Sequence, residues 1–94
     1  MAPTAHLLAS CLYEACTFDG RVSLDLDDAI GSYAWDYGDG STGSEPAPSH
    51  TYRRVGQYRI TLTVTDEAGH RDSAARLVAC RTGSGTRLSC SVTG

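Results

Sequence analysis

Lysine is absent from this 94-residue sequence, so the eight basic residues are all arginines. They are scattered along the chain and outnumbered by eleven acidic residues, which gives a net charge of −3. A nucleic-acid-binding domain usually concentrates its basic side chains on one face. The composition therefore disfavours DNA or RNA as a partner.

Long apolar stretches are also missing. The longest ones span a few residues, whereas a membrane-spanning helix needs about 20. The first ten residues, MAPTAHLLAS, lack the basic leader and the sustained apolar run of a secretion signal. We therefore expect no membrane contact. We interpret residues 1–4 as a leader outside the domain, with any targeting signal carried by sequence beyond this chain.

The chain has little room for a large catalytic cleft. Its 94 residues suffice for one domain. A domain of this size buries only about 60–65% of the surface that it exposes when unfolded. Such a small core often needs reinforcement, which the four cysteines could supply. A content of 40% hydrophobic and 20% charged residues is typical of a soluble globular domain.

No segment has a convincing helical pattern, and the clearest periodicity is that of a strand. Apolar and polar residues alternate through GQYRITLTVTD, residues 56–66. Successive side chains of a strand project to opposite faces, so Tyr58, Ile60, Leu62 and Val64 share one face. Further strands are predicted at residues 5–10, 16–23, 32–37 and 72–80, with turns at 37–40 and 67–70 and a proline-containing loop at 41–48. Several short strands without helices indicate an antiparallel sandwich.

One segment carries a family resemblance. Residues 32–66, SYAWDYGDGSTGSEPAPSHTYRRVGQYRITLTVTD, contain the turn WDYGDG, the segment PSHTY and the strand opening GQY. Together these resemble the signature of the PKD (polycystic kidney disease) domain, and the likeness covers roughly residues 5–80. It differs at Tyr37, where the family usually has phenylalanine, and at Asp28, where it often has glycine. The resemblance implies an all-β fold, an immunoglobulin-like antiparallel β-sandwich of about seven strands over residues 5–80. Residues 81–94 would then be a C-terminal extension, an edge strand or the start of another repeat.

The resemblance also implies a function. PKD domains occur in secreted bacterial proteases, collagenases and chitinases as non-catalytic modules. We therefore expect an extracellular, monomeric accessory domain that binds an insoluble polymer such as collagen or chitin and contacts neighbouring domains of its parent chain. The alternative is a structural spacer or cell-surface adhesion repeat without polymer affinity. Neither alternative requires enzymatic activity.

Four cysteines in a short β domain indicate disulfides formed outside the cytoplasm, although they permit three pairings. We favour Cys11 with Cys16 and Cys80 with Cys90. The four residues between the first pair would bring the two Cα atoms to the roughly 5.5 Å that a disulfide needs. A close pair at that place also resembles PKD domains of secreted proteases. The alternative, in which the first strand pair is joined to the C-terminal segment, stays open. Neither pair has the spacing of a zinc site.

Three aromatic residues, Tyr33, Trp35 and Tyr37, lie on the same side of their predicted strand. A lone tryptophan in the central strand of a small sandwich usually packs in the core, and this is the first interpretation. The alternative is that part of this set is exposed, with Tyr37 or Tyr33 near the strand ends, and stacks on a polymeric ligand. The three residues are therefore the candidate ligand-binding site.

The densest acidic cluster comprises Asp25, Asp27 and Asp28. Carboxylates two residues apart on a loop can converge on one calcium ion, although the glycine and closing glutamate of an EF-hand are missing. The PKD resemblance implies calcium near this loop in some secreted members. The alternative is a solvated charged turn. Calcium is therefore the one cofactor that we expect.

Two further aspartates, Asp36 and Asp39, flank the glycine of the predicted turn. We expect their carboxylates to accept backbone amides two residues further on, because no cleft is available for acid and base catalysis. His50 is predicted to begin a strand with its ring hydrogen-bonded to nearby backbone. No nucleophile motif surrounds the nearby serines. Tyr52 and Tyr58 are predicted to be core or corner residues.

Overall fold

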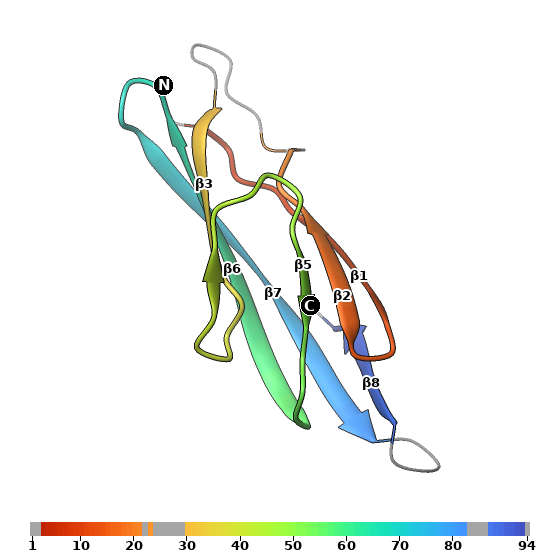
Figure 1. Ribbon diagram of the computed structural model, residues 1–94. Coiled ribbons are helices and arrows are strands. Elements are labelled where there is room, and N and C mark those ends of the chain that lie inside the picture. Colours follow the sequence, from red (N-terminus) through yellow and green to blue (C-terminus); the bar gives the residue numbers. More distant parts are fainter. Residues whose placement is uncertain (1–2, 22, 24–29, 83–86, 94) are drawn as a thin grey trace.

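The computed structural model describes residues 3–21, 23, 30–82 and 87–93. Every helix-or-strand element in these ranges is a strand (Figure 1), so they hold no helix that could cross a membrane. The eight strands are β1 (Leu8–Leu12), β2 (Ala15–Asp19), β3 (Ile30–Asp36), β4 (Thr42–Gly43), β5 (Ser49–Thr51), β6 (Gly56–Asp66), β7 (Arg71–Thr82) and β8 (Leu88–Val92).

The strands form two antiparallel sheets. One sheet has the order β1-β2-β5, and the other has the order β4-β3-β6-β7-β8. The molecule is elongated, with extents of 50 × 19 × 16 Å. The sequence-based prediction of an all-β antiparallel sandwich is confirmed, with β5 crossing from the larger sheet to the smaller one (Figure 1).

The central strand β6 has the alternation that its sequence predicts. Ile60, Leu62 and Val64 are completely buried, and the threonines between them are partly exposed. β6 pairs with β3 on one side and with β7 on the other. One face of β6 therefore supplies the middle of the core, because a strand flanked on both sides and packed on one face buries every second side chain.

Aromatic side chains fill the rest of the core. The ring centroid of Phe18 on β2 lies 5.7 Å from that of Trp35 on β3 and 5.7 Å from that of Tyr37, which directly follows β3. Trp35 also donates its indole N–H to the carbonyl oxygen of Glu45 at 2.7 Å. The other buried hydrophobic residues are Ala5, Leu7, Cys16, Tyr52, Ile60, Leu62, Val64, Val78, Cys80 and Cys90. The two sheets are thus joined by a core in which side chains of both interdigitate.

The segment 41–48, which its prolines predicted to be a loop, contains one short strand. Thr42 and Gly43 form β4, which pairs with the end of β3. The prolines follow β4 and take part in pairing through their carbonyl groups. Pro48 accepts a hydrogen bond from the amide of Phe18 at 2.9 Å, and Pro46 accepts one from Gly20 at 2.8 Å. Proline lacks an amide donor but keeps its acceptor, so the loop prediction holds at Ser41 and residues 44–48 and is wrong only at Thr42 and Gly43.

The first strand pair is shifted relative to its predicted ranges. β1 begins at Leu8, because the amide of Ala5 instead donates to the carboxylate of Asp72 on β7 at 2.8 Å. β2 ends at Asp19, whose carboxylate accepts hydrogen bonds from the backbone and the side chain of Arg21. The predicted strands 32–37 and 72–80 correspond to β3 and β7, each with slightly different ends.

Both disulfides join residues that lie directly opposite each other on neighbouring strands. Cys11 and Cys16 are partners in the β1–β2 register, and Cys80 and Cys90 are partners in the β7–β8 register. Both Cα–Cα distances are 4.0 Å, shorter than expected, because opposite residues of antiparallel strands already lie close together. The structure therefore has the favoured pairing.

β8 is an edge strand of the larger sheet and also contacts the β1–β2 hairpin of the smaller sheet. It pairs with β7, and the amide of Cys90 donates to the carbonyl oxygen of Tyr13 in the β1–β2 turn at 2.8 Å. The Arg87 guanidinium lies 3.8 Å from the centre of the Tyr13 ring and 3.7 Å from the Glu14 carboxylate. Residues 88–92 are thus an edge strand that holds the first hairpin against the larger sheet.

Candidate functional site

The turn after β3 positions the first part of the site. Gly38 and Gly40 have backbone φ angles of +82° and +93°, which residues with a Cβ atom rarely adopt. The Asp36 carboxylate accepts the amide of Gly38 at 2.9 Å, and the Asp39 carboxylate accepts the amide of Ser41 at 3.0 Å. Both aspartates therefore hold the turn in the way that their positions predicted.

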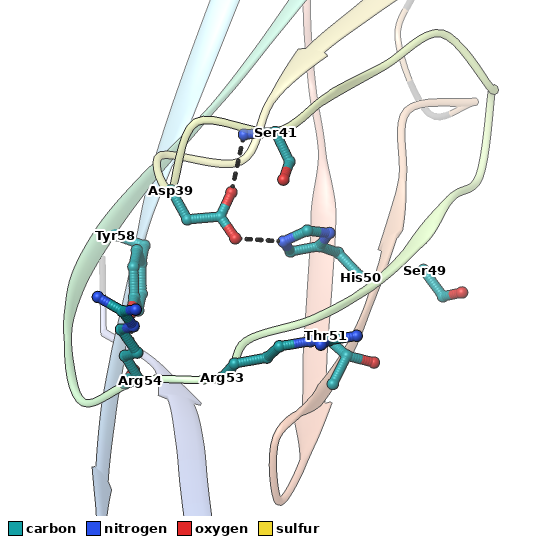
Figure 2. Close-up of a pocket in the computed structure, with 8 residues that line it drawn as sticks. All are labelled: Asp39, Ser41, Ser49, His50, Thr51, Arg53, Arg54 and Tyr58. Carbon is teal, nitrogen blue, oxygen red and sulfur yellow. Dashed lines mark hydrogen bonds and ion pairs between the residues drawn. The ribbon is translucent and has the colours of Figure 1, made fainter.

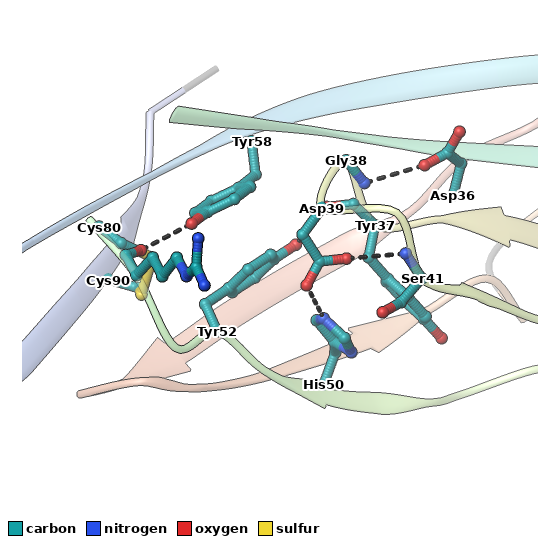
Figure 3. A network of polar contacts seen from close by, with 11 residues as sticks. Asp36, Tyr37, Gly38, Asp39, Ser41, His50, Tyr52, Tyr58, Cys80 and Cys90 are labelled. Atoms are coloured by element: carbon teal, nitrogen blue, oxygen red, sulfur yellow. Dashed lines mark hydrogen bonds and ion pairs between the residues drawn. A yellow bond between two sulfur atoms is a disulfide. The ribbon is translucent and has the colours of Figure 1, made fainter. Parts of the chain in front are cut away.

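His50 on β5 meets this turn from the other sheet. Its Nε2 atom lies 2.7 Å from Oδ2 of Asp39, and its ring stacks on Tyr37 at 4.3 Å with an angle of 7° between the planes (Figure 3). The sequence had predicted a hydrogen bond from the His50 ring to nearby backbone. That prediction was wrong, because β5 crosses between the sheets and brings His50 to a side chain eleven residues earlier in the chain.

Tyr52 and Tyr58 extend the stack of rings below His50. The centroids of their rings lie 4.3 Å apart. The Tyr52 hydroxyl is buried and donates to the carbonyl oxygen of Tyr37 at 2.8 Å, whereas the exposed Tyr58 hydroxyl donates to Arg54 at 2.6 Å. Burial raises the pKa of Tyr52, so its hydroxyl remains a proton donor. These contacts agree with the predicted core and corner roles.

The ionisation of Asp39 reflects two opposing effects. Burial favours the neutral carboxyl group and by itself would raise the pKa of Asp39. Hydrogen bonds from His50 and from Ser41 outweigh burial and lower the pKa of Asp39 below its ordinary value. The carboxylate is therefore charged at neutral pH and already engaged through both of its oxygens.

These residues border an open hollow between the two sheets. Its volume is about 650 Å³ (Figure 2). The turn after β3 forms one side, β5 and the loop after it form another, and Tyr58 of β6 lies at one end. Its lining residues are Asp39, Ser41, Ser49, His50, Thr51, Arg53, Arg54 and Tyr58. Asp36 is not among them, so the two turn aspartates do not face one another across the hollow.

The hollow does not contain a nucleophile activated by His50. In the part of the chain that the structure describes, no hydrogen bond joins the His50 ring to Ser41 or Ser49. The Nε2 atom of His50 is occupied by Asp39. A serine nucleophile needs its base within hydrogen-bonding distance, so this arrangement lacks the geometry of a serine hydrolase.

The predicted aromatic site is largely part of the core. The exposed fractions of Trp35 and Tyr37 are 2% and 4%, and their rings stack at 6.4 Å. A ring enclosed on both faces cannot stack on a polymer, so the core interpretation is confirmed for these two residues and the alternative that they bind ligand is wrong. Tyr33 is half-buried and is the member of the set that keeps an accessible surface.

The predicted calcium ligands Asp25, Asp27 and Asp28 lie outside the described residues. Within the described ranges, no group of three or more histidine, cysteine, aspartate and glutamate residues could hold a metal ion. Asp39 and His50 are a pair rather than such a group. Calcium binding by the acidic cluster therefore stays a prediction.

Two site residues were missed in the sequence. Arg53 and Arg54 resemble an ordinary solvated pair in a loop, and no motif distinguishes them from the other arginines. Only the packing of β5 against the turn after β3 shows that both line the hollow. One signal could have indicated Arg53 and Arg54. Both follow directly after His50 and Tyr52, whose rings contact each other edge to face.

Comparison with known proteins places this chain in a family. The PKD domain family matches residues 1–79. Collagenase ColQ1 of Bacillus cereus is 40% identical over 86 residues, which cover 88% of this chain and 9% of the collagenase. Collagenase ColA of Clostridium perfringens is 45% identical over 56 residues, covering 60% of this chain and 5% of that protein. The pre-pro-metalloprotease PrtV of Vibrio cholerae is 47% identical over 53 residues, covering 56% of this chain and 6% of that protein. This chain thus spans a tenth or less of the length of these curated relatives.

Solved structures agree. The PKD1 domain of PrtV from Vibrio cholerae superposes with a TM-score of 0.83 at 35% identity, covering 87% of this chain and all of that one. The PKD1 domain of Vibrio anguillarum Epp has a TM-score of 0.78 at 39% identity and covers 82% of this chain and 90% of that one. A carbohydrate-binding module of the β-sandwich superfamily, at 22% identity and a TM-score of 0.77, shares the fold. The family match over residues 1–79, together with the superposition on a PKD1 domain, shows that this chain belongs to the PKD domain family.

Proposed function

We propose that this PKD domain is a non-catalytic accessory module of a larger extracellular protein and that it binds an insoluble polymer through its outer surface. The observation that carries the proposal is the open polar hollow beside β5, in a domain whose interior is filled by its own aromatic side chains. A filled sandwich offers only its surface and loops to a ligand. Weak surface contacts become effective when they hold an attached enzyme near a repetitive substrate.

Collagen is the first polymer to test, and chitin is the second. Three relatives that are 38–45% identical to this chain over 56–86 aligned residues are named collagenases. The likeness to the carbohydrate-binding module concerns the fold alone, so it supports chitin less strongly. A protein fibre is therefore the preferred substrate class.

The extracellular location is supported by the two disulfides. Disulfides persist in oxidising compartments and are rare in the reducing cytoplasm. Both cysteine pairs of this chain are oxidised, and they fasten β1 to β2 and β7 to β8. Neighbouring domains of the parent chain are the other partners in this proposal, and the module is proposed to act as a monomer.

Co-sedimentation tests the function. The chain is mixed with insoluble collagen fibres, with chitin particles or with cellulose particles, and the protein in each pellet is measured. We expect enrichment on collagen above the cellulose control. Recovery at the cellulose level on both collagen and chitin would contradict polymer binding.

A pair of variants tests the remaining aromatic candidate. Tyr33→Ala removes the partly accessible ring, and Tyr13→Ala removes an exposed ring in the β1–β2 turn as a matched control. If stacking on Tyr33 contributes, only the first variant loses sedimentation while its melting temperature shows that it stays folded. Equal recovery of both variants would remove Tyr33 from the binding surface.

The elongated shape favours a spacer as the second candidate function. The molecule is 50 Å long and only 19 and 16 Å across, and disulfides fasten two of its strand pairs. Such a body could hold two neighbouring domains apart without binding a polymer. A domain that remains in the supernatant with every polymer would support this alternative.

A further inference from the structure

β5 is an edge strand with an unpaired side. In the described part of the chain, it is the last strand of the β1-β2-β5 sheet. The carbonyl of Pro48 accepts the amide of Phe18 on β2, and the amide of Tyr52 donates to the carbonyl of Glu14 directly before β2. Residues of an antiparallel strand alternate between the two edges, so the backbone groups of Ser49 and Thr51 point away from β2. These groups could pair with another extended chain.

A groove runs along this unpaired side. The hollow of about 650 Å³ shares Ser41, Ser49 and His50 with a second hollow of about 410 Å³. The second one continues along β4 and the segment before β5. The opposite wall consists of the turn after β3, which Figure 2 shows facing β5 across the open space, and of β4. An extended segment lying in this groove would contact both sheets at once.

The charged side chains of the groove indicate which peptide sequences it would bind. Arg53 and Arg54 line it, and among the described residues neither guanidinium has an ion pair or a hydrogen bond. The carboxylate of Asp39 is already bonded to His50 and Ser41. The end of the groove beside Arg53 and Arg54 is therefore positively charged, whereas Glu45 lines the other end. Unpaired guanidinium groups favour carboxylates, which they can hold through two parallel hydrogen bonds.

We propose that an extended acidic segment of a protein polymer, outside any triple-helical stretch, adds to the unpaired edge of β5 and places a carboxylate side chain against Arg53 and Arg54. Main-chain hydrogen bonds to Ser49 and Thr51 supply the affinity, and the two arginines supply the preference for acidic sequences. The edge is short and is preceded by two prolines, Pro46 and Pro48, which limits the pairing to a few residues. The inference rests on the proposed binding of a protein polymer and specifies the site and the sequence class.

Amide chemical shifts of the 15N-labelled chain test the strand addition. The probe is a short blocked peptide of alternating threonine and valine with a central glutamate. We expect it to shift the amide signals of Ser49 and Thr51 and to slow their hydrogen exchange. The same peptide N-methylated on alternate residues cannot pair, and we expect it to lose these effects. Equal effects from both peptides, or unchanged Ser49 and Thr51 signals, would overturn the proposal.

Variants of the two arginines test the acidic preference. Arg53→Gln combined with Arg54→Gln should weaken binding of the glutamate peptide by about three- to tenfold, because exposed ion pairs contribute little each. Binding of a glutamine-centred peptide should change less. Arg71→Gln, at an exposed arginine that begins β7 opposite the far end of β6, is the matched control and should bind as the unmodified chain does. Equal weakening by the control would refute the role of Arg53 and Arg54.

The outcomes separate this inference from the function on which it rests. Sedimentation with collagen without any peptide effect at β5 would refute the inference and leave the proposed function intact. Peptide binding at β5 without sedimentation would support the groove and contradict the polymer function. A uronate oligosaccharide that binds with dependence on Arg53 and Arg54, while the peptide leaves Ser49 and Thr51 unchanged, would assign the arginines to an anionic polysaccharide and refute strand addition.

Discussion

A methyl group added at Gly38 tests how closely the turn after β3 packs on β6. A Cβ atom at this position would lie 2.7 Å from the carbonyl oxygen and 2.8 Å from the amide nitrogen of Arg59, both of them backbone atoms. Gly38 also has a φ of +82°. Gly40 has a similar φ of +93°, but a Cβ atom there would have no neighbour within 4 Å. The two alanine substitutions thus share the conformational cost and differ in the steric one.

The expected magnitudes follow from these two costs. A left-handed backbone conformation lowers the free energy of unfolding by about 1–2 kcal/mol for a residue with a Cβ atom. Replacing glycine also makes the unfolded chain less flexible, which raises the free energy of unfolding by about 0.4–1 kcal/mol. Gly40→Ala should therefore lower the free energy of unfolding by about 1 kcal/mol. Overpacking against a backbone that cannot move aside adds about 1–3 kcal/mol. Gly38→Ala should therefore cost about 2–4 kcal/mol.

Thermal and urea unfolding with the disulfides intact measure the difference. For a domain of this size, each kcal/mol lowers the melting temperature by about 4–8 °C. Gly38→Ala should thus melt about 10–25 °C below the unmodified chain, and Gly40→Ala about 5 °C below it. Equal effects of the two substitutions would refute the close contact between the turn and Arg59 and, with it, the placement of Asp39 in the groove.

Three further predictions concern the same region and the acidic segment. Asp39→Asn should destabilise the chain at neutral pH. The lowered pKa of Asp39 stabilises the folded chain at pH values above the pKa of about 3.9 that an aspartate has in the unfolded chain. In urea titrations, the stability lost in the variant should therefore become smaller below about pH 4. A loss that stays the same at every pH would contradict this prediction. Tyr52→Phe should cost about 1–3 kcal/mol in chemical unfolding, because it leaves the buried carbonyl of Tyr37 without its donor. Tyr58→Phe, which removes an exposed hydroxyl, should cost about 0.5 kcal/mol or less, and similar losses would argue against this difference. Calcium should raise the melting temperature through Asp25, Asp27 and Asp28, and a chelator should reverse the effect; a melting temperature that is unchanged by either would dismiss the site.

The candidate site could be predicted from the sequence only in part. The turn aspartates were predicted correctly, because a side chain that accepts an amide two residues on depends on local spacing alone. The partner of His50 was not predicted, because Asp39 reaches it only after β5 has crossed to the other sheet. The buried state of Tyr37 depends on rings from Phe18 and His50, which period-two alternation cannot place.

The sequence by itself determined the all-β class, the central strand and its buried face. Alternation at residues 56–66 and the glycine turn at 38–40 are local signals, and they act before any long-range contact forms. The tertiary structure alone decided which strand edge stays unpaired and which charges line it. β5 leaves one side of Ser49 and Thr51 open, and the loop after it brings Arg53 and Arg54 to the groove. Such placement depends on the order of strands across two sheets, which residue spacing along the chain does not encode.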